Sequence, residues 1–217
     1  RRDAMIFIDR NDAGKQLGDQ LSIDPTDNYL VLALPRGGVP LGIELAKELS
    51  VPFDVALAKK MVHPAYQEYA IGALAENGEP IINEEAEVNE DWIKKEAVRV
   101  ENEIKRRREL YDEILPKQEV CNKDIILVDD GIATGMTMLA AIKAIKSQHP
   151  HSIAVAVPII PRDTFNDLKS MVDQVFYVEI PKYFKGAVGA YYQNFPQISD
   201  EEVTQMIVDF QRDVANS

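Results

Sequence analysis

Residues Ile125–Thr137 read IILVDDGIATGMT, and this stretch decides the fold class. It opens with a continuous apolar run, which is typical of a strand buried on both faces of a parallel sheet. Two acids, Asp129 and Asp130, follow the run directly, and small and hydroxyl-bearing residues lead from them into a helical pattern. The order predicts a strand, a short loop and a helix, with both acids at the carboxyl end of the strand.

The loop after these acids has the features of an anion-binding site. The first N–H groups of a helix lack intrahelical partners, and the helix dipole favours a negative charge beside them. Glycines allow backbone conformations that are closed to other residues, and they let a phosphate approach closely. The threonines add hydroxyl donors. We therefore expect a phosphate monoester to bind the loop formed by Gly131, Ile132, Ala133, Thr134, Gly135, Met136 and Thr137.

Asp129 and Asp130 suit a different part of such a ligand. Carboxylates do not bind the phosphate itself, because like charges repel, but they suit ribose hydroxyls, a Mg²⁺ ion or a developing positive charge. Two other interpretations fit less well. An acidic strand end before an ordinary capped helix would not require the whole pattern, and a Walker A loop would have Lys where Met136 stands.

Outward from this stretch, apolar runs alternate with helical patterns along most of the chain. We expect strands at Tyr29–Leu34, Phe53–Ala58, Lys123–Val128, Ser152–Val157 and Gln174–Val178, and helices at Asn11–Leu21, Val39–Leu49, Asn89–Leu115, Thr134–Gln148, Arg162–Met171 and Asp200–Val214. The alternation predicts an α/β fold: a doubly wound, mainly parallel, five-stranded sheet with helices on both faces. Ligands of such sheets bind beyond the carboxyl ends of the strands.

Two segments depart from this alternation. About residues 60–118 form an insertion with a β-hairpin and the long charged helix, and about residues 180–217 form a small C-terminal unit, here called the hood. The hairpin is expected from Tyr69–Leu74 and Pro80–Asn83, which flank the turn-forming pair Asn77-Gly78. We expect residues 1–217 to form a single domain.

Composition excludes several classes of function. Lys and Arg number 24 against 36 Asp and Glu, so the net charge is −12, which disfavours non-specific nucleic-acid binding but allows a local basic pocket. The one cysteine, Cys121, cannot form an internal disulfide, which favours a reducing compartment. No apolar run approaches the roughly 18–20 residues of a membrane span, and a signal-peptide pattern is missing. We therefore expect a cytoplasmic protein without a membrane partner.

Taken together, these segments resemble type I phosphoribosyltransferases, which use phosphoribosyl pyrophosphate (PRPP). The acidic stretch is similar to the PRPP-binding motif of that family. The layout of most of the chain is similar to a group described as predicted phosphoribosyltransferases. The motifs that carry this resemblance are Asp9–Gly14 (DRNDAG), Pro35–Gly38 (PRGG) and Val128–Gly135 (VDDGIATG), and Pro181–Phe184 in the hood also fits.

The resemblance implies a pentosyltransferase that moves the 5-phosphoribosyl group from PRPP to a nitrogenous acceptor, with a nucleobase as the favoured class, and releases pyrophosphate. It implies that Asp129 and Asp130 hold the ribose hydroxyls, bind the cofactor Mg²⁺ and act in catalysis. It also implies that Arg36, Gly37 and Gly38 bind pyrophosphate, since Arg36 offers a planar donor group for phosphate oxygens. A homodimer is an analogy with the fold only.

The loop after the second strand is often a mobile lid in this family. Lys59 and Lys60 begin the corresponding segment, so either could neutralise the leaving pyrophosphate. We favour Lys60 as the catalytic residue and assign Lys59 to substrate binding, with a solvated basic pair as the alternative. His63 on the same segment is more typical of a surface residue than of a general base.

Several interpretations stay open at this stage. The run Arg106–Arg108 suits a solvated helix face better than a phosphate patch, because neighbouring glutamates supply helical ion pairs. The aromatics of the hood either stack on a planar acceptor or pin a long loop to the core; they are Tyr183, Phe184, Tyr191 and Tyr192. Two other functions use the same phosphate loop: a PRPP-binding regulator without acceptor chemistry, and a hydrolase with water as the acceptor.

Overall fold

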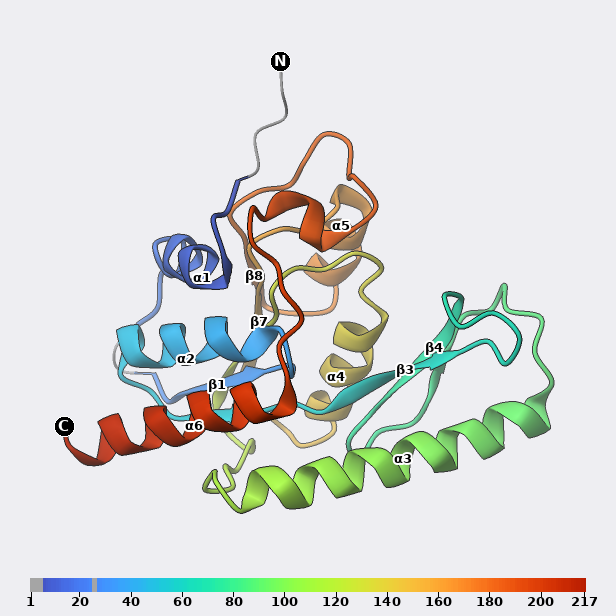
Figure 1. The fold of residues 1–217 in the computed structure, drawn as a ribbon, viewed down its shortest axis with the longest axis horizontal. Helices are drawn as coiled ribbons and strands as arrows, with labels where there is room; N and C mark the ends of the chain where they lie inside the picture. The colour runs from blue at the N-terminus through green and yellow to red at the C-terminus, as the bar shows by residue number, and fades with distance from the viewer. Residues whose placement is uncertain (1–5, 25–26) are drawn as a thin grey trace.

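The computed structural model describes residues 6–24 and 27–217. Figure 1 shows a central sheet between helices and, beside it, a long helix that runs along a separate hairpin. The helices are α1 (Arg10–Gly18), α2 (Gly38–Leu49), α3 (Glu90–Asp112), α4 (Met136–Lys146), α5 (Arg162–Lys169), the short 3-10 helix η1 (Val188–Tyr191) and α6 (Asp200–Ala215). The strands are β1 (Tyr29–Ala33), β2 (Phe53–Val55), β3 (Ala58–Val62), β4 (Ala70–Ala75), β5 (Ile81–Ile82), β6 (Asp124–Val128), β7 (Ser152–Ala156) and β8 (Gln174–Phe176).

Within the described residues, the central sheet has five strands in the order β2-β1-β6-β7-β8, and every pair is parallel. Parallel neighbours need crossover connections, which α2, α4 and α5 supply. From β1 the chain winds outward to β2, and from β6 it winds the other way, to β7 and β8. The predicted doubly wound sheet is therefore confirmed, and the order of its strands switches between β1 and β6, where α/β sheets bind their ligands.

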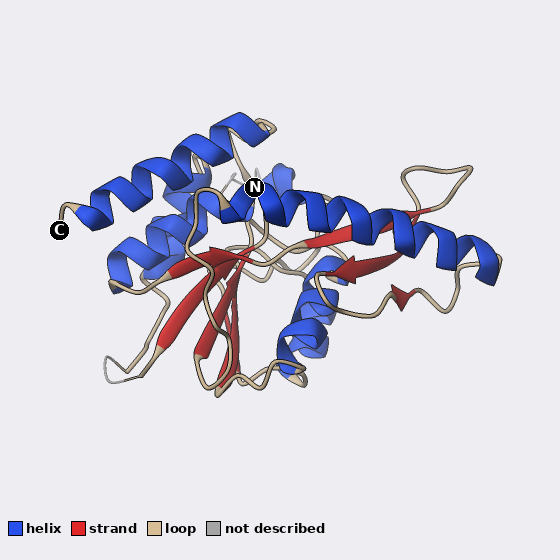
Figure 2. Cartoon of the chain, turned by 90° about the horizontal axis from the view of Figure 1, so that it is seen from below, coloured by secondary structure: helices blue, strands red, loops and turns tan. Residues whose placement is uncertain are grey.

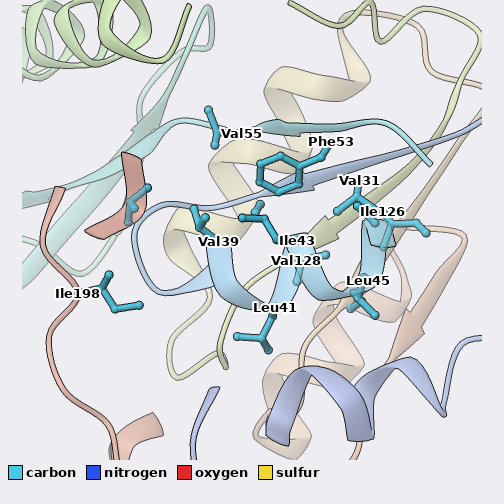
Figure 3. Packing of buried hydrophobic residues seen from close by; sticks show 14 of the residues in the cluster. Val31, Val39, Leu41, Ile43, Leu45, Phe53, Val55, Ile126, Val128 and Ile198 are labelled. Atoms are coloured by element: carbon cyan, nitrogen blue, oxygen red, sulfur yellow. The ribbon is translucent and has the colours of Figure 1, made fainter. Parts of the chain in front are cut away.

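Successive side chains of each strand enter two different apolar layers. Val31 and Ile126 pack into the layer that α1, α2 and α6 cover, and Figure 3 shows this layer around α2. Leu30 and Ile125 point the other way, into the layer that α4 and α5 cover. Burial on both faces explains why these strands are continuous apolar runs rather than alternating ones.

The second strand is shorter than predicted. The sequence predicts one strand over Phe53–Ala58, whereas β2 ends at Val55 and a separate strand, β3, begins at Ala58. The parallel ladder ends where the Ala56 N–H donates to the Ala33 carbonyl at 2.9 Å. The chain then leaves the sheet edge and pairs with β4. The expectation that a lid loop begins at Lys59 and Lys60 is wrong, because both lysines lie inside β3.

The predicted hairpin is present but has a further strand. β4 and β5 pair in antiparallel fashion around Asn77-Gly78, and the Gly78 N–H donates to the Ala75 carbonyl at 3.0 Å. The more extensive partner of β4 is β3, which the prediction missed because its lysines interrupt the apolar pattern. In this small sheet, Ile71 packs toward α3, and Ala73 packs toward α4. Figure 2 shows the hairpin and α3 projecting together from the central sheet.

Other element boundaries lie within a few residues of the predicted ones. α1 ends at Gly18 rather than Leu21, and α4 begins at Met136 rather than Thr134, because Gly135 has a left-handed backbone with φ of 79°. The C-terminal helix α6 runs along α2 in Figure 1. In the part of the chain that the structure describes, no helix is both long and apolar enough to cross a membrane.

Arg108 anchors α3 to both sheets. Its Nη1 donates to Asp54 Oδ1 at 3.2 Å, its Nη2 donates to the Val55 carbonyl at 3.0 Å, and its Nε and Nη2 donate to the Glu76 carboxylate, each at 2.8 Å. Asp54 is only 4% exposed, and burial raises the pKa of its carboxyl group while Arg108 opposes that rise. The prediction of a solvated face is therefore wrong for Arg108.

We expect Arg108→Met to lower the free energy of unfolding by roughly 3–5 kcal/mol at neutral pH, because the Asp54 carboxylate would stay buried without its cation. Burial raises the pKa of Asp54, so protonation in acid removes the unpaired charge, and the deficit should shrink as the pH falls through that pKa. Urea unfolding at several pH values measures both effects.

The matched control for this experiment is Arg106→Met, which removes an exposed cation from the same helix. Its effect should stay within about 0.5 kcal/mol. Equal losses in the two variants would contradict an anchoring role for Arg108. The double variant Arg108→Met with Asp54→Asn should recover part of the loss, because no charge is then left buried.

Candidate functional site

Two loops interlock at the carboxyl edge of the central sheet, at the point where its strand order switches. The loop Pro35–Gly38 follows β1, and the loop from Asp129 follows the neighbouring strand β6. A Cβ on Gly37 would overlap the carboxylate of Asp130, and a Cβ on Gly38 would lie 2.8 Å from the Val128 carbonyl oxygen. Both positions therefore need glycine so that the two loops can touch.

The loop after β1 is a tight turn with a cis peptide bond between Pro35 and Arg36. The Gly38 N–H donates to the Leu34 carbonyl at 3.0 Å, so this group closes the turn and is not directed at a ligand. The Arg36 side chain is about one-third exposed, and its Nη1 lies 3.7 Å from Asp200 Oδ1 at the start of α6. Of the three predicted residues in this loop, Arg36 presents a charged group to solvent. Gly37 and Gly38 leave room for the loop after β6, which a larger side chain would displace.

The acidic pair is held by the surrounding protein. Asp129 Oδ1 accepts a hydrogen bond from the Asp130 N–H at 2.8 Å. The Asp130 carbonyl accepts one from the buried Tyr192 hydroxyl at 2.6 Å. Asp130 Oδ2 accepts one from Arg10 Nε at 3.0 Å. These contacts fix both carboxylates at the end of β6.

Arg10 is a site residue that the sequence prediction did not include. Its guanidinium also donates from Nη1 to the Pro196 carbonyl at 2.7 Å, and its Cζ lies 4.0 Å from the centre of the Phe195 ring. One side chain thus connects α1, the acidic pair and the hood. The sequence signal for Arg10 is the motif Asp9–Gly14, which contains it and is part of the resemblance to the family.

Burial and mutual repulsion set the charge of the acidic pair. Burial raises the pKa of Asp129 well above its usual range, and the Asp130 carboxylate raises it further. Burial also raises the pKa of Asp130, but Arg10 opposes this rise by favouring the charged form. The pair therefore binds protons more readily than exposed aspartates do, and the negative charge is held most firmly on Asp130, beside Arg10.

The predicted phosphate loop surrounds the start of α4. Gly131 has φ of 151°, and a Cβ there would lie 2.6 Å from Ile159 Cγ2, so no other residue fits. The helical ladder begins where the Leu139 N–H donates to the Gly135 carbonyl at 2.8 Å, which leaves the preceding N–H groups ahead of the ladder.

The members of this loop differ in what they can offer a ligand. Ile132 is buried, and its N–H donates to the Ile159 carbonyl at 3.0 Å, so it supports the loop from the core. Thr134 is exposed, whereas Ala133, Met136 and Thr137 are partly exposed. The exposed hydroxyl groups and first-turn N–H groups suit an anion.

A cleft of about 310 Å³ opens between the loop after β1, the strand β3 and the helix α3. We call it the basic cleft, because four cationic side chains line it: Arg36, Lys59, Lys60 and Arg107. Thr137, at the start of α4, also lines it, so the cleft adjoins the phosphate loop.

The two lysines of the cleft differ in their partners. Lys59 donates a hydrogen bond to Glu103 of α3 and forms an ion pair with it. Lys60 is exposed, and within residues 6–24 and 27–217 no carboxylate lies at ion-pair distance from it. Of the two lysines, Lys60 is thus the one whose charge is not already paired with a described carboxylate.

The interpretation of Arg106–Arg108 as a solvated helix face is also wrong for Arg107. Arg107 stands three residues after buried Ile104 and four before buried Tyr111, so it falls on the inward stripe of α3. This spacing can be seen in the sequence, but the glutamates around the run favour a solvated face and mask it. Arg106 alone fits that interpretation, since it is exposed.

Most of the hood aromatics pin the chain to the core. Tyr191 and Tyr192 are 3% and 2% exposed, and Phe184 stacks on Tyr191 with ring centres 5.6 Å apart. Tyr183 is 80% exposed and is the aromatic of this group that is open to a partner. His63 lies at the outer end of the hairpin beside Tyr66, with ring centres 5.2 Å apart. Its contacts are those of a surface residue.

The acidic pair suits a metal ion that binds together with a phosphorylated substrate. Mg²⁺ prefers oxygen ligands, and one or two carboxylates suffice when substrate phosphates and water complete its shell. Asp129 and Asp130 supply carboxylate oxygens of this kind. Across residues 6–24 and 27–217, no group of three or more His, Cys, Asp or Glu could hold a metal. The donor set therefore suits Mg²⁺ bound together with a phosphorylated substrate.

Comparison with known proteins identifies the family to which this chain is similar. The family described as "Phosphoribosyl transferase domain" matches residues 6–193. Two Mycobacterium tuberculosis proteins, from strains CDC 1551 and H37Rv, carry the name "Putative phosphoribosyl transferase" and are 35% identical to this chain over 216 residues. The match covers 98% of this chain and 48% of each relative. The chain thus spans about half the length of the curated relatives it matches.

The fold is also similar to a solved structure. The crystal structure of TT1426 from Thermus thermophilus has 35% sequence identity to this chain and a TM-score of 0.79, and the match covers 95% of this chain and 99% of that one. Because so little of the chain falls outside the match, the inserted hairpin and α3 belong to the shared fold.

We expect Asp129→Asn to stabilise the protein at neutral pH by about 0.5–2 kcal/mol. Burial raises the pKa of Asp129, so between the unfolded and folded pKa values the folded protein binds more protons than the unfolded chain. The free energy of unfolding of the wild type therefore falls as the pH rises through this window, and Asn removes that fall. The measurement is urea unfolding from acid to neutral pH.

The control for this variant is Asp167→Asn, which changes an exposed acid on α5 and should alter stability little. The advantage of Asp129→Asn should disappear in acid, near and below the usual carboxyl pKa of about 3.9. An Asp129→Asn protein that is less stable than the wild type at neutral pH would show that the buried carboxylate does not destabilise the fold.

Proposed function

The chain belongs to the family of phosphoribosyl transferase domains, and we propose that it transfers the 5-phosphoribosyl group from PRPP to a nitrogenous acceptor, with release of pyrophosphate. The observation that carries this proposal is the meeting of three chemically different features at one sheet edge. A phosphate loop, an acidic pair and a basic cleft adjoin one another there. PRPP contains three matching groups: a 5′-phosphate, a ribose and a pyrophosphate.

The phosphate loop is the proposed site of the 5′-phosphate. The N–H groups at the start of α4 and the hydroxyls of Thr134 and Thr137 are the donors. Ala133 stands where the family often has a hydroxyl residue, which removes one hydroxyl contact and keeps the N–H group. The left-handed backbone of Gly135 supports this assignment, because it turns the chain into the helix directly at the site.

Asp129 and Asp130 are the proposed partners of the ribose hydroxyls. Carboxylates accept hydrogen bonds from hydroxyl groups, and an ionised carboxylate near C1′ stabilises positive charge that develops there. Arg10 supports this role for Asp130, because its guanidinium orients the carboxylate and favours the charged form.

Pyrophosphate is the group for which the basic cleft is proposed. Arg36 and Lys60 offer positive charge where the leaving group would accumulate negative charge. Asp129 and Asp130 would hold Mg²⁺ bound together with PRPP, and this ion supplies positive charge that neutralises phosphate oxygens.

The proposed reaction exchanges one bond at C1′ for another. The bond from C1′ to the pyrophosphate oxygen breaks, and its electron pair leaves with pyrophosphate. A nitrogen lone pair of the acceptor forms the new bond to C1′, and the acceptor gives up its N–H proton to solvent. The contribution of the protein is position and charge rather than a covalent intermediate.

Hydrolysis of PRPP is the second candidate function. The burial of Tyr191 and Tyr192 favours it, because these two rings pack in the core and leave exposed Tyr183 as the hood aromatic that is open to a base. Water would then take the place of the acceptor, with the same phosphate loop and acidic pair.

The test is a ³¹P NMR time course of the protein with PRPP and Mg²⁺, with and without a pool of nucleobases, orotate and nicotinate. We expect pyrophosphate to appear only with the pool, and division of the pool then identifies the acceptor. Pyrophosphate without any acceptor would establish the hydrolase instead. Broadened PRPP resonances without conversion would point to a regulator.

We expect Asp130→Asn to lower turnover of PRPP at least about tenfold, which corresponds to roughly 1.4 kcal/mol in the barrier. The substitution removes the charge near C1′ and the ion pair with Arg10. Asp19→Asn, at an exposed position after α1, is the control and should keep wild-type turnover. Unchanged turnover in Asp130→Asn would remove the acidic pair from the proposed mechanism.

A further inference from the structure

The basic cleft contains a cation to which the proposed function gives no task. We infer that Arg107, supplied by the inserted helix α3, is a binding residue for the pyrophosphoryl group of PRPP. The inference rests on the proposed function and extends it, because it gives the inserted helix α3 a direct part in substrate binding.

The position of Arg107 is fixed by its neighbours on α3. Ile104 and Tyr111 are buried on the inward stripe of the helix, and Arg107 stands on the same stripe between them. Arg108 pins this turn of the helix to Asp54 and Glu76. Arg107 therefore lines the cleft from a fixed helix, and no loop has to rearrange to bring it there.

Arg107 and Arg36 face the same space from two different elements. Burial raises the pKa of the Tyr111 hydroxyl, and the charges of Arg107 and Arg36 both lower it. The Tyr111 hydroxyl thus interacts electrostatically with both guanidinium groups. Two cations that face one space repel each other, and a bound polyanion converts this repulsion into attraction.

The charges around the cleft favour an anion with several charges. Lys59 is already paired with Glu103, and Arg36 lies at 3.7 Å from an exposed aspartate, Asp200. Arg107, like Lys60, has no carboxylate at ion-pair distance among the residues that the structure describes. Although the net charge of the chain is −12, this small cleft thus contains two cations without a carboxylate partner in residues 6–24 and 27–217.

The shape of the guanidinium donors and the size of the cleft both favour a pyrophosphoryl group as the ligand. A guanidinium binds two phosphate oxygens at once, which an ammonium does not do. The cleft, at about 310 Å³, lies near the lower end of the range for small-molecule sites, roughly 300–1,000 Å³, so it suits a small anion rather than a polymer. Thr137 in its wall connects it to the phosphate loop, as one PRPP molecule would require.

Isothermal titration of the whole chain with two probes tests the inference. The probes are magnesium pyrophosphate, which should bind the basic cleft, and ribose 5-phosphate, which should bind the phosphate loop and the acidic pair. We expect Arg107→Gln to weaken binding of magnesium pyrophosphate about tenfold or more, since a charge-assisted hydrogen bond is lost. Binding of ribose 5-phosphate should change less than about twofold, because its site lies apart from Arg107.

The matched control is Arg106→Gln, which removes the same charge from the next position on α3, where the side chain is exposed. It should leave both affinities unchanged. Glu103→Gln should act in the opposite direction and tighten pyrophosphate binding a few-fold, because it frees the charge of Lys59. If Arg107→Gln does not fold, Arg107→Lys takes its place and should give a smaller loss, since the charge stays and the planar donor group goes.

The two probes separate failure of the inference from failure of the proposed function. Wild-type protein that binds both probes, with Arg107→Gln binding pyrophosphate as tightly as the wild type, would overturn the role of Arg107 and leave the proposed function intact. Equal losses in Arg107→Gln and Arg106→Gln would also overturn it, because only the net charge would then matter. Wild-type protein that binds neither probe would overturn the proposed function, and the inference with it.

Discussion

The partly buried ion pair between Arg10 and Asp130 is the contact on which the rest of the site depends. Asp130 stands at the end of β6, and Arg10 reaches it from the start of α1 while also holding Pro196 and Phe195. Gly37 of the neighbouring loop packs against the same carboxylate. Four separate parts of the chain therefore meet at one charge, and the site forms only when all of them are in place.

Two opposite charge distributions stand side by side at this edge of the sheet. Burial raises the pKa of Asp129, so the fold keeps this acid at a cost in stability at neutral pH. The basic cleft has an excess of positive charge, because neither Lys60 nor Arg107 has a carboxylate at ion-pair distance among the described residues. A ligand that carries hydroxyl groups at one end and several negative charges at the other would match both distributions. This is the usual exchange of stability for function.

The insertion between β2 and β6 has both a structural and a functional aspect. Its hairpin extends the chain beyond the central sheet, and α3 covers the hairpin (Figure 2). Arg108 fixes the helix to the fold, whereas Arg107, one position away, lines the cleft. Adjacent residues on one helix thus have different tasks, because a helix turns about 100° per residue: Arg108 is directed at Asp54 and Glu76, and Arg107 is directed at the cleft.

The sequence by itself determined the strands of the central sheet, the acidic pair and the phosphate loop, because each depends on neighbouring residues: an apolar run, two acids at its end, and glycines before a helix. Tertiary structure alone decided which distant side chains meet. Whether Lys59 pairs with Glu103, whether Arg107 and Arg36 share a cleft, and whether Arg10 reaches Asp130 depend on how the insertion and α1 pack. A charged side chain has no preferred partner until packing brings one within a few ångströms and removes the water between them.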